Sequence, residues 1–257
     1  MSIRTLALVA IAAASIGHLA AANPIKVGVA AEAYPPFTSP DSSGHWTGWE
    51  IDLMNAMCKD QKLDCVITPF AWDGIIPALS AGQIDMIMSS MSITPERQKV
   101  IDFSDKYYVT PLGMAVAKDA TFGMEPADLA GKVIGVQVSS SNEVYAKKFF
   151  GKGSTFQEYQ TQDELNVDLA AGRIDADVAD VVTLTDFINS DFGQTCCKLL
   201  GALPYDAETL GIGVGAGFRK SDTALRAKFN KGLADVRASG KYEKISKSYF
   251  NFDIYGN

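Results

Sequence analysis

The chain has 257 residues, of which 47% are hydrophobic and 21% charged, a composition typical of a globular protein with one large or two modest domains. Its 30 Asp and Glu residues outnumber its 23 Lys and Arg residues, which gives a net charge of −7. Because an acidic molecule repels polyanions, we expect no nucleic-acid partner and no binding to an anionic membrane surface.

Residues 1–22 have the pattern of a secretory signal peptide. Arg4 precedes an apolar run at positions 6–16, and small residues follow at positions 20–22. The run is shorter than the roughly 20 residues that span a bilayer. We therefore predict cleavage after Ala22 and a mature protein in an oxidising compartment, most simply the bacterial periplasm.

The cysteines give one predicted disulfide and one open question. Four cysteines lie beyond the predicted cleavage site, and four permit three pairings. We predict a bond between Cys58 and Cys65, which joins the end of a predicted helix at 49–59 to the next strand; two buried free thiols are the alternative. Cys196 and Cys197 are adjacent, so a bridge between them is strained, and the sequence leaves their pairing open.

An internal repeat is the most informative feature of the chain. Residues 73–85 read DGIIPALSAGQID and residues 163–175 read DELNVDLAAGRID, with identity at six of thirteen positions. In each copy we expect the first aspartate, Asp73 or Asp163, to cap a short helix. The alternative is a chance similarity of two helix–strand units.

The same repeat predicts the end of each helix and the strand after it. Gly82 and Gly172 stand where a helix needs a residue that tolerates positive φ in order to stop, and an apolar strand comes after each, at 84–88 and 174–179. Helix and strand signals alternate in both halves, as parallel sheets require. We therefore predict an α/β fold with two related lobes, each an open, parallel-type sheet flanked by helices.

Polar residues gather where four predicted strands end, at 31–37, 89–97, 139–143 and Asp180. Open α/β sheets bind ligands beyond the carboxyl ends of their strands. We therefore expect these segments to meet at one cleft.

Two helix starts in these segments can recognise an anion. Ser140 and Glu143 form a capping box, and the free N–H groups of the following helix attract negative charge; the alternative is that the serine only caps the helix. Thr94 and Pro95 start another helix that aims Arg97, whose guanidinium matches a carboxylate with two parallel hydrogen bonds. The alternative for Arg97 is a surface ion pair worth about 0 to 1 kcal/mol.

One acid and two aromatic residues complete the candidate site. Asp180 ends an apolar strand, where an ammonium group would offset the cost of burying its charge; solvent exposure is the alternative. Tyr34 and Trp72 can enclose an aliphatic or cationic side chain between their rings, or pack in the core. An arginine for a carboxylate and an aspartate for an ammonium together describe a receptor for a free α-amino acid.

These residues resemble those of the periplasmic solute-binding proteins of polar amino-acid ABC transporters, the group that includes lysine/arginine/ornithine, histidine and opine binders. The resemblance covers the whole mature chain and is carried by residues 33–37, 48–53, 72–79, 84–97 and 249–256. It implies the two-lobed, type II periplasmic-binding-protein fold, binding of an amino acid or opine, and delivery to an ABC permease. We expect a monomer with no cofactor, no metal and no catalytic residue.

The resemblance also implies a role for each candidate residue. Arg97 binds the ligand carboxylate together with Ser141. Ser90 and Ser92 contribute to binding the carboxylate and also to binding the α-ammonium, which Asp180 holds. The aromatic pair holds the side chain of the ligand. The complete predicted set is Glu32, Tyr34, Trp72, Ser89, Ser90, Ser92, Arg97, Ser140, Ser141 and Asp180.

Departures from the family pattern bear on the identity of the ligand. Relatives that hold cationic or opine ligands often have an acid three residues before the tyrosine, where this chain has Ala31 with Glu32 beside it. Ser139 replaces a common glycine, and Gln137 replaces a frequent apolar residue. The small residue argues against simple lysine or arginine binding and leaves a bulky or polar conjugate such as an opine open.

The family fold predicts the limits of the domains. Residues 23–109 and 212–257 form lobe 1, residues 112–204 form lobe 2, and segments 109–112 and 204–211 form the hinge.

The alternative function is an enzyme on the same fold, because cyclohexadienyl dehydratases resemble these binders. Glu32 is then the candidate acid or base. The mature chain has a single histidine, His45, which argues against a catalytic triad and against a histidine-rich metal site.

Overall fold

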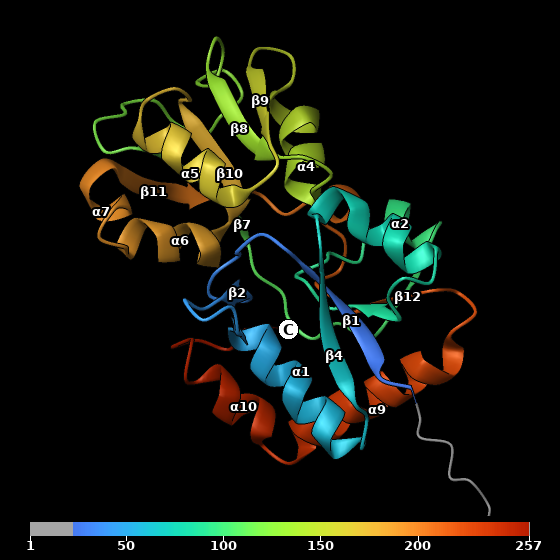
Figure 1. Cartoon of the computed structure of the whole chain (residues 1–257). Coiled ribbons are helices and arrows are strands. Elements are labelled where there is room, and N and C mark those ends of the chain that lie inside the picture. Colours follow the sequence, from blue (N-terminus) through green and yellow to red (C-terminus); the bar gives the residue numbers. More distant parts are fainter. Residues whose placement is uncertain (1–22, 257) are drawn as a thin grey trace, which may run out of the picture.

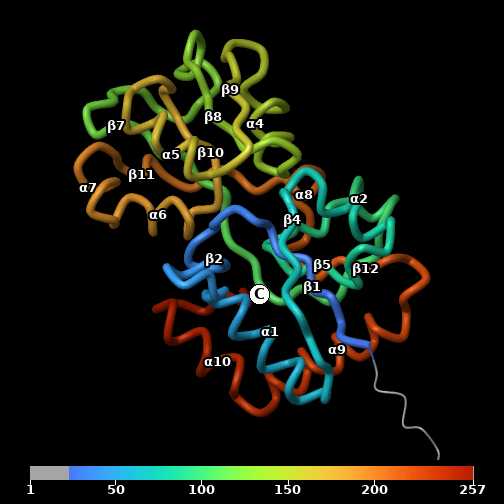
Figure 2. The backbone as a smooth tube through the Cα atoms, in the orientation of Figure 1, coloured from blue at the N-terminus to red at the C-terminus, as the bar shows by residue number. Residues whose placement is uncertain are grey.

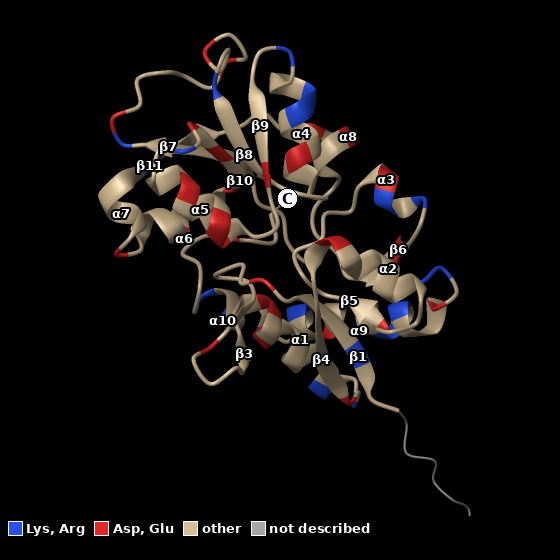
Figure 3. Cartoon of the chain, turned by 45° about the horizontal axis from the view of Figure 1, so that its top comes forward, with Lys and Arg blue, Asp and Glu red and all other residues tan. Residues whose placement is uncertain are grey.

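The computed structural model describes residues 23–256, so the predicted signal peptide lies outside the described residues. The chain folds into two α/β lobes, each built on a five-stranded sheet (Figure 1). Charged residues of both signs are spread over the helices and loops of both lobes (Figure 3). Within residues 23–256, no helix is both long and apolar enough to cross a membrane.

The sheet of the first lobe has the strand order β4-β1-β5-β12-β6. Its parallel strands are β1 (Ile25–Ala30), β4 (Cys65–Phe70) and β5 (Met86–Ile87). Antiparallel pairing adds β12 (Gly217–Phe218) and then β6 (Asp102–Phe103). A separate ribbon consists of β2 (Ser39–Pro40) and β3 (Trp46–Thr47).

Helices cover both faces of the first sheet, because apolar side chains alternate to both sides of its strands. One core includes Trp49 and Phe229 and lies under α1 (Trp49–Asp60), α9 (Thr223–Ala238) and α10 (Lys241–Ser246). The other core includes Ile75 and lies under the 3₁₀ turn η1 (Trp72–Gly74) and α2 (Ile75–Ser80). The short helix α3 (Pro95–Gln98) comes after β5.

The sheet of the second lobe has the order β11-β7-β10-β8-β9. Its parallel strands are β8 (Val133–Gln137), β9 (Thr155–Tyr159) and β10 (Ala176–Asp180); antiparallel pairing adds β7 (Leu112–Ala117) and β11 (Cys197–Ala202). Its helices are α4 (Ser141–Phe150), α5 (Gln162–Ala170), α6 (Val181–Asn189), α7 (Gly193–Cys196) and α8 (Ala207–Leu210).

The strands that follow the repeated segments, β5 and β10, occupy equivalent places in the two sheets. In the first lobe β1 lies between β4 and β5, and in the second β8 lies between β9 and β10, with every pairing parallel. The predicted α/β fold with two sheet-based lobes is therefore confirmed. The parallel-type part of each sheet is present, and the strands that enter after the chain crosses between lobes, β7 and β12, add antiparallel pairing to it, so that both sheets are mixed.

The ends of the repeated helices agree with the prediction, and their starts do not. Gly82 and Gly172 lie just past α2 and α5 with φ of 73° and 68°. Thr161 caps α5 in a capping box with its third residue, so this helix begins before Asp163. Asp73 lies inside η1, and α2 begins after Gly74 with no side-chain cap.

Two disulfides join the four cysteines. Cys58 and Cys65 are bonded, with their Cα atoms 6.2 Å apart, and tie the end of α1 to the start of β4. This pairing is the predicted one. Cys196 and Cys197, which the sequence left open, are also bonded to each other, at the junction of α7 and β11.

The chain passes between the lobes after β6 and again after β11. Figure 2 shows the first passage as the green tube that runs towards β7. The residue limits that we assign to the lobes and to the hinge segments stay predictions.

Candidate functional site

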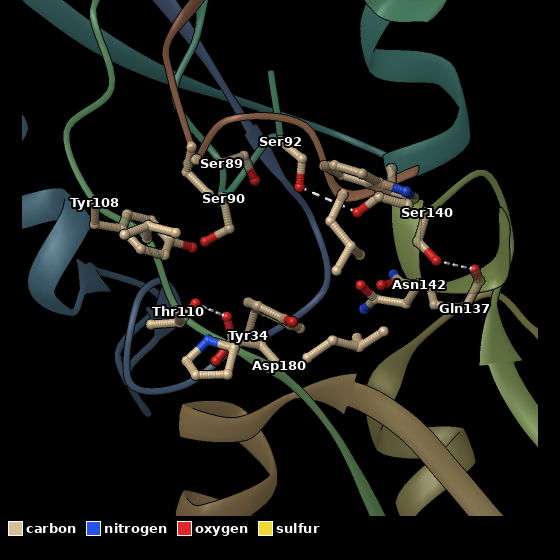
Figure 4. Close-up of a pocket in the computed structure, with 18 of the residues that line it drawn as sticks. Tyr34, Ser89, Ser90, Ser92, Tyr108, Thr110, Gln137, Ser140, Asn142 and Asp180 are labelled. Atoms are coloured by element: carbon tan, nitrogen blue, oxygen red, sulfur yellow. Dashed lines mark hydrogen bonds between the residues drawn. The ribbon is translucent and has the colours of Figure 1, made fainter. Parts of the chain in front are cut away.

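A cavity of about 360 Å³ lies between the lobes (Figure 4). Residues of both lobes line it, and the structure brings all ten predicted ligand-binding residues to its wall. That these residues bind a ligand stays a prediction.

Arg97 reaches the cavity from α3, and its local geometry agrees with the sequence prediction. Thr94 caps the helix by accepting a hydrogen bond from the Arg97 N–H at 3.3 Å. The guanidinium donates from Nη1 to the carbonyl of Ser92 and from Nη2 to the carbonyl of Ser139 in the second lobe, both at 3.1 Å. Trp72 covers it, with Cζ 5.4 Å from the ring centroid.

Burial lowers the pKa of Arg97 to about 10, because desolvation disfavours the charged form, yet the group stays charged at pH 7. Its guanidinium has five N–H donors, and the two bonds to carbonyls leave others for a ligand. A desolvated cation whose known partners are neutral carbonyls and a ring attracts an anion.

Asp180 ends β10 and also caps α6. Its carboxylate accepts hydrogen bonds from the N–H of Val182 at 2.7 Å and from the hydroxyl of Thr110. Burial raises the pKa of Asp180 to about 6, with these hydrogen bonds acting in the opposite direction. The group is therefore mostly ionised at pH 7, and a cation placed beside it would offset the cost of its burial.

The start of α4 brings second-lobe serines to the cavity. Ser140 caps the helix by accepting from the Glu143 N–H at 3.0 Å, as predicted. The capping box is incomplete, because the Glu143 carboxylate accepts from the N–H of Ser139 instead. Ser141 Oγ lies 3.0 Å from Ser92 Oγ of the first lobe, so the lobes touch across the cleft (Figure 4).

The aromatic residues line the cavity, but their rings have protein neighbours. Trp72 faces Arg97, and Tyr34 stacks on Phe37 with the ring centroids 6.0 Å apart. Burial, reinforced by the charge of Asp180, raises the pKa of Tyr34. The predicted sandwich of a ligand side chain between Tyr34 and Trp72 stays a prediction.

Glu32 and Ser89 also line the cavity. Ser89 Oγ accepts from the N–H of Ala30 at 2.9 Å and so ties the end of β1 to the loop after β5. Glu32 Oε1 accepts from the N–H of Trp72 at 3.4 Å, whereas Glu32 Oε2 is buried and has no hydrogen-bond partner within residues 23–256. A buried carboxylate oxygen without a partner is an unmet hydrogen-bond acceptor, which a donor would satisfy.

Sequence reasoning missed several residues of the cavity wall. Most lie in or beside the segments predicted as hinge: Tyr108, Thr110, Leu203, Tyr205 and Leu210. Asn142, the second residue of α4, had a usable signal, since it comes directly after the serines that start the helix.

Two α/β lobes that enclose a cavity, with an arginine from one lobe and an aspartate from the other in its wall, define a two-lobed solute-binding protein. Residues 25–252 match the family of bacterial extracellular solute-binding proteins, family 3, and the chain belongs to this family.

Named relatives resemble the chain over nearly its whole length. It is 40% identical over 254 residues to the L-arginine-binding protein of Pseudomonas aeruginosa, covering 98% of this chain and 97% of that protein. It is 37% identical over 252 residues to the lysine/arginine/ornithine-binding periplasmic protein of Escherichia coli, covering 97% and 96%. A solved structure of an ancestral arginine-binding protein bound to arginine superposes with a TM-score of 0.80 at 33% identity, covering 89% of this chain and 98% of that one.

Proposed function

We propose that this protein binds an amino acid with a cationic side chain, or an opine, in the bacterial periplasm and delivers it as a monomer to an ABC permease. The observation that carries the proposal is the set of charged groups in the cavity wall. Arg97 is basic, whereas Glu32 and Asp180 are acidic. An amino acid with a cationic side chain complements this set, because it has one anionic and two cationic groups. An opine such as octopine has these groups and one further carboxylate.

Each charged group then has one task. Arg97 binds the α-carboxylate, because a guanidinium offers paired donors to two carboxylate oxygens. Asp180 binds the α-ammonium. Glu32 receives the cationic end of the side chain on its free Oε2, in place of the acid that relatives carry one residue earlier. This arrangement removes the objection that the small residue Ala31 raised against lysine or arginine.

Ligand binding and lobe closure are coupled in this proposal. Arg97 belongs to the first lobe and Asp180 to the second, so one ligand satisfies both only when the lobes approach each other. The closed form then presents surfaces of both lobes to the permease, which reports that the protein is loaded.

Calorimetric titration tests the proposal. We expect L-arginine, L-lysine or octopine to bind the purified protein with a micromolar to nanomolar Kd, roughly −8 to −12 kcal/mol, within the ceiling of about −18 kcal/mol for a ligand of about 12 heavy atoms. L-glutamate, which reverses the charge of the side chain, should not bind. Binding of L-glutamate in preference to every cationic compound would refute the proposal.

An absorbance assay addresses the alternative of a dehydratase. An enzyme that acts on carboxylated rings needs a placed acid or base, and Glu32 is the candidate in the cavity wall. Prephenate and arogenate are incubated with the protein, and ultraviolet absorbance monitors the aromatic product. We expect no product; turnover that Glu32→Gln abolishes would establish the enzyme instead.

A further inference from the structure

A buried carboxylate lies directly behind the cavity wall. Glu50 is the second residue of α1, is fully buried and does not line the cavity. Its Oε1 accepts hydrogen bonds from the N–H of Ser90 at 2.8 Å and from the hydroxyl of Tyr107, and its Oε2 accepts from the hydroxyl of Ser90 at 2.9 Å. All three of these donors belong to neutral groups.

Ser90 is the member of this set that lines the cavity. Its φ is 51°, in the left-handed region that non-glycine residues rarely occupy, so an outside contact has to hold it there. The two hydrogen bonds to Glu50 are such a contact. They fix the backbone of Ser90 through its N–H and the side chain through its hydroxyl.

The same bonds decide what Ser90 can offer to a ligand. A serine has one backbone N–H and one hydroxyl proton, and Glu50 accepts both. The hydroxyl oxygen has two lone pairs, and the side chain of Tyr108 also forms a hydrogen bond with this hydroxyl. With its proton given to Glu50, Ser90 has one lone pair left to accept a hydrogen bond from a ligand and cannot donate one. It therefore suits the ammonium of an amino acid and not the carboxylate, to which the resemblance also assigned it.

Glu50 also connects the cavity wall to the first passage between the lobes. Tyr107, which donates to Glu50, precedes Tyr108 of the cavity wall, and the carbonyl of Tyr107 accepts from the hydroxyl of Tyr242 in α10 at 2.6 Å. The carboxylate therefore holds three segments of the first lobe at one point, although they are distant in the sequence.

We propose that Glu50 is a positioning residue for ligand binding, which holds Ser90 as a pure acceptor for the ligand ammonium. The proposal rests on the proposed function, since it takes an amino acid as the ligand. Glu50 acts through Ser90 and needs no contact with the ligand.

The decisive variant is Glu50→Gln, which keeps the size of the side chain and replaces one acceptor oxygen with a donor. In calorimetric titrations with L-arginine we expect its Kd to rise at least tenfold. The matched control is Glu243→Gln. Glu243 lies on α10, is 69% exposed and pairs with Lys247, so this change should leave the Kd within twofold of wild type. In a Ser90→Ala background, Glu50→Gln should cost less than threefold, because the hydroxyl that it directs is gone.

A second measurement needs no ligand. In ¹H–¹⁵N spectra of the unliganded protein, the amide proton of Ser90 should move upfield in Glu50→Gln, because it loses a carboxylate acceptor, while folded-state dispersion persists. The proposal is overturned by an unmoved Ser90 amide, by a Kd within twofold of wild type, or by an equal loss with and without the Ser90 hydroxyl. If the wild-type protein binds no amino acid, the proposed function fails, and the Ser90 amide still decides whether Glu50 holds this residue.

Discussion

Replacing Arg97 with alanine tests the anion-binding end of the site. The change removes the only basic side chain of the cavity wall among residues 23–256 and leaves the ligand carboxylate desolvated and unpaired. Loss of one partner of a buried charge pair costs about 2 to 5 kcal/mol. Since each 1.4 kcal/mol is a factor of ten, we expect the Kd for L-arginine to rise roughly 30-fold to several thousand-fold in a calorimetric titration.

Two further variants separate charge from geometry. Arg97→Lys keeps the charge and loses the planar pair of donors, so its affinity should lie between those of wild type and Arg97→Ala. Arg173→Ala removes an exposed arginine that pairs with Asp168 on the second lobe and should leave the Kd unchanged. A loss of less than tenfold in Arg97→Ala, with an unchanged Tm, would refute the role of Arg97.

The acidic residues of the cavity and the predicted disulfide give three other predictions. The ligand ammonium binds ionised Asp180, whose pKa is about 6 in the unliganded protein. The affinity should therefore fall as the pH drops through 6, and at pH 5 it should be about one tenth of its value at pH 7. If Asp180→Asn keeps this pH dependence in titrations, the assignment is contradicted. Glu32→Gln should lower the preference for L-arginine over L-glutamine at least tenfold in competition binding; an unchanged preference would exclude Glu32 from the side-chain subsite. Replacing Cys58 and Cys65 with alanine opens a link between residues 7 apart and should lower the free energy of unfolding by about 2 to 3 kcal/mol in urea titrations, with the Kd unchanged because neither residue lines the cavity; equal stability would show that the bond does not constrain the unfolded chain.

The parts of the site that the sequence predicts are those with strong local signals. Thr94 and Pro95 fix the start of a helix, and this start places the backbone of Arg97. Asp180 could be predicted as a site residue because it is an acid at the end of an apolar strand. In both cases the residues that give the sequence signal lie within five positions of the functional side chain.

The missed parts depend on contacts between distant segments. Thr110 donates to Asp180 from 70 residues away, and no local pattern distinguishes it from another hinge residue. Glu50 looks in the sequence like an exposed acid in the first turn of a helix, where the dipole favours negative charge. Its burial results from partners 40 and 57 residues away.

The predicted cap at Asp163 is wrong for a local reason. Two helix-start signals compete there, and the capping box that begins upstream at Thr161 prevails.

The contacts between the lobes bear on the proposed coupling of ligand binding to closure. Within residues 23–256, the hydrogen bonds that cross the cleft include one between Ser92 and Ser141 and one from Arg97 to the Ser139 carbonyl. At about 1 kcal/mol each, they are comparable to the few kcal/mol that separate the states of a two-state protein. A ligand that joins Arg97 to Asp180 forms hydrogen bonds to a charged group at each end in the closed form alone, and each such bond contributes about 1.5 to 3 kcal/mol. One bond at each end then supplies about 3 to 6 kcal/mol, which is close to the roughly 5.5 kcal/mol that changes a 1:99 population to 99:1.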